Sequence, residues 1–160
     1  MVLPLANQSN DEEQEYLVDG LTEDIIISLS AFKWLRVCPR NSAFAFKGKG
    51  AGHDEIRNVL GVRYILEGSA RRAGSRIRVT AQVSDITTNA QIWAERFDRS
   101  LSDLFELQDE LTESISRCIP HEIMKNEQVR AKSRNYGSLD SWHLYQRGMW
   151  HFHQFWSPDD

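Results

Sequence analysis

The chain has 160 residues, of which 41% are hydrophobic, and a net charge of -4. This length fits one domain of ordinary size with a short appendage, and it can bury a core without disulfides or a structural metal. The mildly negative charge argues against a nucleic-acid partner, which generally requires a strongly basic face. No apolar run approaches the ~18 residues of a membrane helix, and residues 1–10 do not resemble a secretion signal. We therefore expect a cytoplasmic protein with no membrane segment in this chain.

The first forty residues predict two strands with a helix between them. A short apolar run at Val2–Ala6 predicts the first strand, and a second run at Trp34–Cys38, closed by Pro39, predicts another. Between these runs, apolar residues recur at helical spacing and form one stripe over residues 16–32, namely Leu21, Ile25, Leu29 and Phe32. The acidic run at 11–15 that precedes this helix is interpreted as a solvated loop.

A loop is expected at residues 41–52, followed by a short helix that Asp54 can cap and that Gly61 can end. The loop finishes in the glycine-rich segment Gly48–Gly52, directly before the helix. Such a segment can cradle phosphate through backbone N–H groups. However, Lys49 is not followed by the Ser or Thr of a phosphate loop, so an ordinary flexible loop remains the alternative.

The alternation of apolar and polar residues is clearest in the middle of the chain. The segments 62–67, 76–83 and 91–97 predict three strands, separated by turn sequences at Ala73–Ser75 and Thr87–Ala90. Consecutive strands joined by short turns predict an antiparallel meander with one face on a core and the other face exposed. Together with the two earlier strands, they predict a mixed sheet of about five strands.

The remaining third of the chain predicts two helices. A long amphipathic helix begins after Ser102, and Pro120 is expected to bend or end it. Charged and polar residues at 124–137 are interpreted as a linker, after which Ser138 can cap a helix rich in aromatic residues. The predicted fold class is therefore α/β (α+β): a mixed sheet with helices packed on it, plus a C-terminal aromatic helix.

Five blocks of sequence, in order, resemble one known kind of domain: Leu3–Asn7, Tyr16–Ile25, Ala43–Lys49, Leu60–Ser69 and Ile92–Asp98. Together they look like the TolB amino-terminal-like domain found in bacterial class III adenylate cyclases and in some winged-helix transcriptional regulators. The resemblance implies a domain that follows a catalytic or DNA-binding domain and precedes tetratricopeptide repeats. The pattern of Trp142, Tyr145 and Gly148 resembles the first helix of such a repeat.

The resemblance implies three segments. Residues 1–123 would form the TolB amino-terminal-like α/β domain, 124–137 a linker, and 138–160 the truncated first repeat helix. The resemblance does not imply catalytic activity, because the metal-binding aspartates and purine-contacting residues of a class III cyclase have no counterpart in this sequence. We expect no catalytic, metal or cofactor-binding residues in this chain.

Two groups of residues are candidates for binding a partner. Arg71, Arg72 and Arg76 crowd the first hairpin together with Arg78, where they could contact an acidic protein surface or a nucleic-acid backbone, or simply keep the sheet edge solvated. The second group lies on the last helix and is apolar: Trp142, Tyr145, Met149 and Phe152. This group could bind a partner or pack on a missing repeat helix, and uncovered it would favour self-association.

The remaining polar residues do not predict an enzyme. His143, His151 and His153 are wrongly spaced on a helix to share one metal ion. Cys38 and Cys118 are too few and too far apart for a disulfide framework and are expected to be buried thiols. The sequence thus favours a non-catalytic regulatory or protein-interaction module of a bacterial signalling protein, whose partner is another protein or a neighbouring domain. The alternative is a small-ligand or nucleotide sensor that uses the loop at 46–54 and the basic hairpin.

Overall fold

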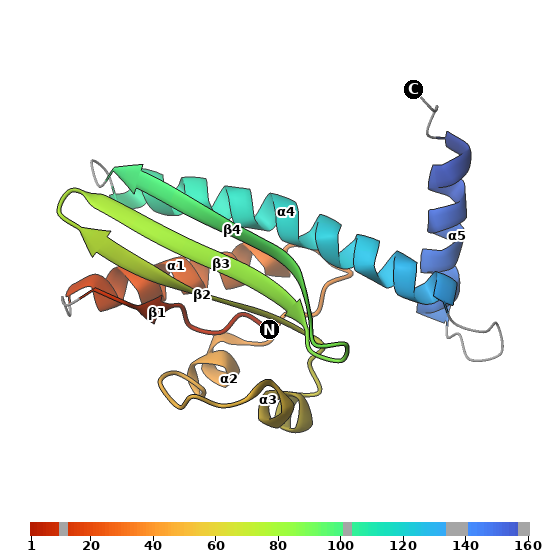
Figure 1. Ribbon diagram of the computed structural model, residues 1–160, viewed down its shortest axis with the longest axis horizontal. Helices are drawn as coiled ribbons and strands as arrows, with labels where there is room; N and C mark the ends of the chain where they lie inside the picture. The colour runs from red at the N-terminus through yellow and green to blue at the C-terminus, as the bar shows by residue number, and fades with distance from the viewer. Residues whose placement is uncertain (10–12, 101–103, 134–140, 157–160) are drawn as a thin grey trace. The chain divides into compact units, whose positions relative to one another are not determined.

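The computed structural model describes residues 1–9, 13–100, 104–133 and 141–156 (Figure 1). The elements in chain order are β1 (Ala6–Asn7), α1 (Glu13–Ser30), α2 (Arg40–Phe44), α3 (His53–Leu60), β2 (Tyr64–Ala73), β3 (Arg76–Asp85), β4 (Ala90–Ser100), α4 (Leu104–Ser133) and α5 (Ser141–Trp156). The chain forms two compact units, residues 1–120 and 121–160, and the division falls inside α4.

The sheet has four strands in the order β1-β2-β3-β4 within the described residues. β1 pairs with β2 in parallel, whereas β2, β3 and β4 pair antiparallel as the predicted meander. Gly74 and Asn89 adopt the left-handed conformation in the two turns of the meander, with φ of 61° and 54°. The mixed α/β class is confirmed, with four strands in place of about five.

The structure has no strand at Trp34–Cys38, so the prediction of a strand there is wrong. The chain turns repeatedly after α1: the Phe32 N–H donates to the Leu29 carbonyl at 3.2 Å, and the Leu35 N–H donates to the Phe32 carbonyl at 2.9 Å. Residues 36–39 then run without regular structure. A short apolar run does not by itself distinguish a strand from a half-buried connection, because both place apolar side chains against a core.

The N-terminal segment and the predicted loop also differ in detail from expectation. Val2 makes an isolated parallel bridge with Leu66, and the regular strand is limited to Ala6–Asn7. Part of the expected loop is the short helix α2. α3 begins after Gly52, so Asp54 lies in its first turn and does not cap it, whereas Gly61 ends the helix at φ 64° as predicted.

The main core of the first unit lies between one face of the sheet and the helices α1 and α4, which Figure 1 shows behind the strands. The predicted stripe of α1 supplies Leu21, Ile25 and Leu29, all at most 3% exposed. The sheet supplies mainly small and branched residues, namely Ala70, Val79, Ala81 and Val83, together with Phe97. The first half of α4 supplies every fourth residue, namely Leu107, Leu111, Ile115 and Ile119. Helical spacing on two helices therefore covers one side of the meander.

A second, smaller core covers one end of the opposite face. Ile56 of α3, Ile65 of β2 and Ile86 after β3 are buried together, and Phe46 and Ala51 of the connecting segment pack against them. Ile65 and Leu66 are both buried although successive strand residues point to opposite faces. The sheet is thus covered on both faces near the start of β2, and its hairpin half remains open on one face.

α4 continues through Pro120 to Ser133, so the prediction that Pro120 could end this helix is wrong. Residues 124–133 of the expected linker are helical. A proline removes one backbone donor, but the following residues are mostly good helix formers, such as Lys125, Glu127, Gln128, Arg130 and Ala131. Residues 134–140 lie outside the described part of the chain, including the predicted cap Ser138. Whether the domain boundaries fall at 123 and 138 stays a prediction.

None of the helices in the described ranges is both long enough and apolar enough to cross a lipid bilayer. Cys38 and Cys118 are unpaired and half-buried, not fully buried as expected.

Candidate functional site on the open sheet face

The open half of the sheet presents rows of side chains that run across three strands. Directly opposite residues share a face, so the register places Glu67, Gln82 and Ala94 in one row and Ser69, Thr80 and Arg96 in the next. Two further rows follow toward the hairpin: Arg71, Arg78 and Asp98, then Ala73, Arg76 and Ser100. We call these four rows the open sheet face.

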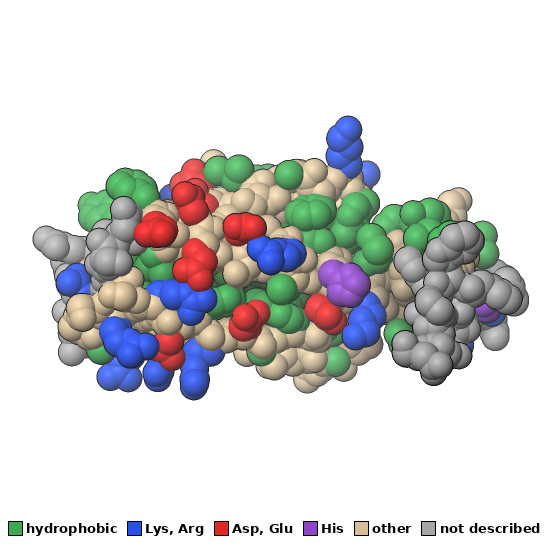
Figure 2. Space-filling view, turned by 90° about the horizontal axis from the view of Figure 1, so that it is seen from above, with side chains coloured by type: hydrophobic (Ala, Val, Ile, Leu, Met, Phe, Trp, Pro, Cys, Tyr) green, Lys and Arg blue, Asp and Glu red, His purple; other side chains and the backbone are tan. Residues whose placement is uncertain are grey.

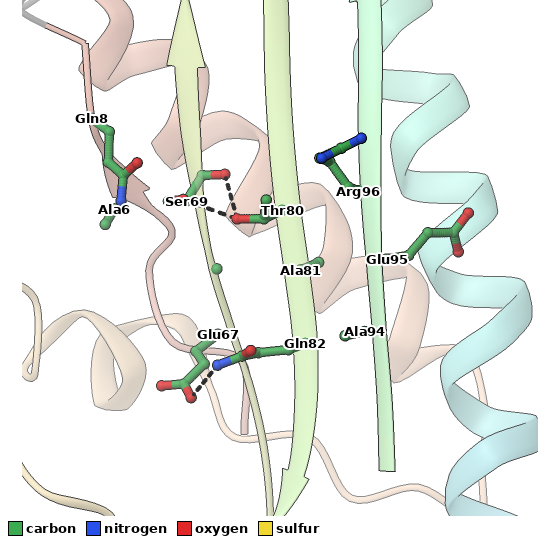
Figure 3. A pocket seen from close by; sticks show the side chains of 11 residues that line it. Ala6, Gln8, Glu67, Ser69, Thr80, Ala81, Gln82, Ala94, Glu95 and Arg96 are labelled. Carbon is green, nitrogen blue, oxygen red and sulfur yellow. Dashed lines mark hydrogen bonds between the residues drawn. The ribbon is translucent and has the colours of Figure 1, made fainter. Parts of the chain in front are cut away.

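A shallow hollow occupies the first two rows and is bordered by Ala6 of β1 and by Gln8, which follows that strand (Figure 3). Ala94 and the backbone of Gly68 are among the groups that line it. The polar groups around it are held by one another: the Ser69 and Thr80 hydroxyls are 2.9 Å apart, and Gln82 Nε2 donates to Glu67 Oε1 at 2.9 Å. His53 Nε2 lies 3.4 Å from the other oxygen of Glu67. The polar side chains of this surface are therefore held in position by contacts with one another.

The hairpin end of the same face is basic. Arg71 stands directly opposite Arg78, and Arg78 Nε lies 3.1 Å from both carboxylate oxygens of Asp98. Arg96 Nε is 3.6 Å from Asp98 as well. The hydrogen bond from Arg78, followed by the charges of Arg78, Arg96 and Arg76, lowers the pKa of Asp98. Figure 2 shows basic side chains gathered over this end of the molecule, at its lower left.

The structure brings together two of the three arginines predicted on the hairpin. Arg71 and Arg76 line one hollow with Arg78 and Asp98. Arg72 is exposed but opposite Ile77, so its side chain belongs to the other face. Its backbone N–H donates to Ser9 Oγ at 2.8 Å. Arg96 and Asp98 were not singled out from the sequence. The alternation along β3 and β4 could have indicated them, because they share the strand face of Arg78.

The aromatic candidates on α5 lie in the second unit. Tyr145 and Phe152 are each 55% exposed, whereas Trp142 and Met149 are partly buried. The rings of Trp142 and Tyr145 are 5.9 Å apart, and Lys132 Nζ lies 3.9 Å above the Trp150 ring. α5 thus keeps an exposed aromatic surface, in agreement with its sequence, and its use by a partner stays a prediction.

The second unit also buries polar groups that the sequence did not indicate. Glu127 of α4 is 6% exposed and accepts from Arg130 Nη1 at 3.2 Å. His143 Nε2 of α5 lies 3.8 Å from the same carboxylate. Gln146 is completely buried. Glu127 was assigned to the linker, so its burial had no signal in the sequence.

The glycine-rich loop before α3 has a structural role that its sequence only partly suggested. Gly48 and Gly50 are left-handed, with φ of 70° and 59°, and the flanking Phe46 and Ala51 pack on the small core. The first turn of α3 carries Asp54 and Glu55, whose charges repel an anion from the helix N-terminus. This geometry disfavours the phosphate-binding alternative. Among the described residues, no three His, Cys, Asp or Glu side chains are grouped closely enough to hold a metal ion.

Comparison with known proteins gives one clear relative in sequence and a shared fold. The chain is 49% identical over 139 residues to a protein of Rhizobium meliloti (strain 1021) named "Putative adenylate cyclase 3". The match covers 87% of this chain and only 23% of that protein. No protein-family model matches the chain.

Among solved structures, lipoprotein GNA1162 from Neisseria meningitidis is similar with a TM-score of 0.53 and 16% identity, over 74% of this chain and 94% of that one. TolB from Acinetobacter baumannii gives a TM-score of 0.45 and 11% identity, over 74% of this chain and 29% of that one. The expected start of a tetratricopeptide repeat finds no support in these similarities. The chain therefore shares its fold with a bacterial lipoprotein, and its sequence is similar to a segment of a much longer protein named as an adenylate cyclase.

Proposed function

We propose that this chain is a non-catalytic regulatory domain that binds a protein partner, or a neighbouring domain, on its open sheet face. The observation that carries the proposal is the hairpin half of the sheet, where the described helices cover only the opposite face. The 49% identity to part of a protein named as an adenylate cyclase supports a signalling role. A cytoplasmic location is part of this proposal. The cyclase chemistry would then belong to another part of such a protein.

The chemistry of the open sheet face suits recognition of a protein surface. Its hydroxyl, amide and carboxylate groups are already fixed by neighbours, as in the Ser69–Thr80 and Glu67–Gln82 pairs. A polar surface that needs little ordering loses less entropy when a partner binds. Non-obligate interfaces are about as polar as the rest of a protein surface, so this composition is no obstacle to binding.

The exposed aromatic surface of α5 is the other place where a partner could bind, as its sequence suggested. Tyr145 is of a residue type that often contributes most of the binding energy of an interface, and phenylalanine, as at Phe152, is enriched in interfaces. The two surfaces belong to different compact units, and substitutions can separate their contributions.

Photocrosslinking from position 80, followed by mass spectrometry, would identify a partner, and the affinity of the purified partner would then be measured. We expect Thr80→Glu and Arg96→Glu each to weaken binding by about tenfold or more, since each loses about 1.4 kcal/mol or more of contact energy. Ile27→Arg is the matched control, because Ile27 is 63% exposed on α1, the helix that packs on the opposite face of the sheet. Circular dichroism would verify that each variant is folded.

Unchanged affinity in both open-face variants would contradict the proposal. If only Trp142→Ala and Tyr145→Ala lose affinity, the partner binds the aromatic surface of α5 and not the open sheet face. The purified chain should form no cyclic nucleotide from ATP or GTP with Mg²⁺ or Mn²⁺, and measurable cyclase activity would contradict its non-catalytic role.

A further inference from the structure

Arginine occurs in three successive rows of the open sheet face. Arg96 lies in the row of Ser69 and Thr80, Arg71 and Arg78 share the next row, and Arg76 lies in the row after that. Successive rows on one face are two residues apart, which is about 6.8 Å along a strand. The alternate side chains of any extended peptide have the same spacing. The arginines therefore have the repeat of an extended ligand that is laid along the strands.

Within the described part of the chain, the positive charge of these rows is only partly neutralised. Asp98 is the one carboxylate among the described residues of the three rows, and it is shared by Arg78 and Arg96. Arg76 reaches Asp98 only as a more distant charge. The side chain of Arg71, opposite Arg78, makes no hydrogen bond or ion pair with any described residue. Like charges directly opposite on paired strands are destabilising, so a bound anion would relieve this repulsion.

The geometry points to an extended acidic segment of a protein, with Asp or Glu at alternate positions, as the ligand of these arginines. This inference rests on the proposed function and specifies the chemistry of the partner. Guanidinium groups bind carboxylates through paired hydrogen bonds, and an acidic residue at every second position would meet one arginine row after another. No exposed aromatic side chain stands in the three rows to stack on a base, which favours a peptide over single-stranded nucleic acid.

Fluorescence anisotropy with two labelled peptides of equal composition tests the spacing. In one peptide Glu alternates with Ser, and in the other the same residues are arranged in two blocks. We expect the alternating peptide to bind about fivefold more tightly, and Arg71→Gln and Arg76→Gln each to weaken it by about five- to tenfold. Arg117→Gln is the control, because Arg117 is exposed on α4 and pairs with Glu113 away from this face. Raising the salt concentration should weaken binding, because the contacts are exposed charges.

Equal affinity for the two peptides, or binding that survives both substitutions, would overturn the inference. Tighter binding of pyrophosphate or of single-stranded DNA at the same salt concentration would also overturn it, in favour of a phosphate ligand. A partner identified by crosslinking that depends on Thr80 but does not compete with the acidic peptide would leave the proposed function intact and remove only this inference. The substituted arginines are exposed, and thermal unfolding would show that each variant remains folded.

Discussion

At the scale of single residues, Gly68 explains how closely the first two strands of the meander and the N-terminal segment pack. A Cβ atom at this position would lie 2.0 Å from the carbonyl oxygen of Thr80 and 3.0 Å from Leu5 Cδ2. The first atom belongs to the backbone of β3 and cannot move without opening the β2–β3 ladder. Glycine is required here because of this close approach, since a methyl group has no space.

Gly68→Ala is therefore expected to lower the free energy of unfolding by about 2 kcal/mol or more, as overpacking in a core does. Urea unfolding followed by circular dichroism would measure the change. Gly148→Ala is the matched control: nothing lies within 4 Å of the added Cβ, and alanine is favoured over glycine in a helix by about 1 kcal/mol. Equal effects of the two substitutions would show that β2 and β3 can adjust at this position.

Asp85 shows how a single charge can be kept in a nearly buried position at the end of β3. Its side chain is 1% exposed, and burial alone raises its pKa. Hydrogen bonds outweigh this effect and lower the pKa: Arg63 Nε donates at 3.1 Å, Thr87 Oγ1 at 2.7 Å and the Thr87 backbone N–H at 3.0 Å. The same bonds fix the turn between β3 and β4.

At the scale of secondary structure, one side chain links α1 to the N-terminal segment. Thr22 is fully buried, its hydroxyl donates to the Val18 carbonyl at 2.8 Å, and its oxygen accepts the Leu5 N–H at 3.1 Å. The short β1 has few ladder bonds of its own, so this contact satisfies a backbone donor that the sheet does not.

Thr22→Val keeps the shape of the side chain but leaves the Leu5 N–H buried without an acceptor. We expect a loss of about 1–3 kcal/mol in the free energy of unfolding, which is the usual cost of an unsatisfied buried donor. Hydrogen exchange should accelerate at the Leu5 amide more than at amides of the β2–β3 ladder. Thr22→Ser, which keeps the hydroxyl, is the control. A valine variant as stable as the wild type would mean that water replaces the lost acceptor.

At the scale of the whole molecule, several paired carboxylates make folding sensitive to acid. Hydrogen bonds from Lys47, Arg78 and Arg99 lower the pKa values of Glu15, Asp98 and Glu110, and those of Arg63 and Thr87 do so for Asp85. A carboxylate whose pKa is lower in the folded state stabilises the fold above its unfolded-state pKa. That stabilisation is lost as the pH falls through the folded-state value.

We therefore expect the thermal unfolding midpoint to fall as the pH decreases below the ordinary values of 4.5 for Glu and 3.8 for Asp. Thermal unfolding between pH 7 and pH 3 measures this directly. Asp85→Asn should be less stable than the wild type at pH 7, because Arg63 loses its partner, and should lose less on acidification. A midpoint that is unchanged between pH 4.5 and pH 3 would contradict this account.

The sequence by itself determined the elements whose pattern is local. Alternation along 62–97 predicted the meander, and helical spacing predicted α1 and the first part of α4, because one strand or helix face decides which side chains are buried. Gly61 and the turn residues were identified for the same reason, since a left-handed backbone restricts the residue type on its own. The arginines of the hairpin were also visible, as a cluster of charge.

Only the tertiary structure decided which of these residues act together. The local pattern left two outcomes open at Trp34–Cys38 and at Pro120, because an apolar run fits a strand or a connection and a proline can bend or end a helix. The register of three strands placed Arg96 and Asp98 beside Arg71 and Arg78 and sent Arg72 to the other face. A surface for binding is a property of neighbouring strands, and strand register is set by contacts between segments distant in sequence.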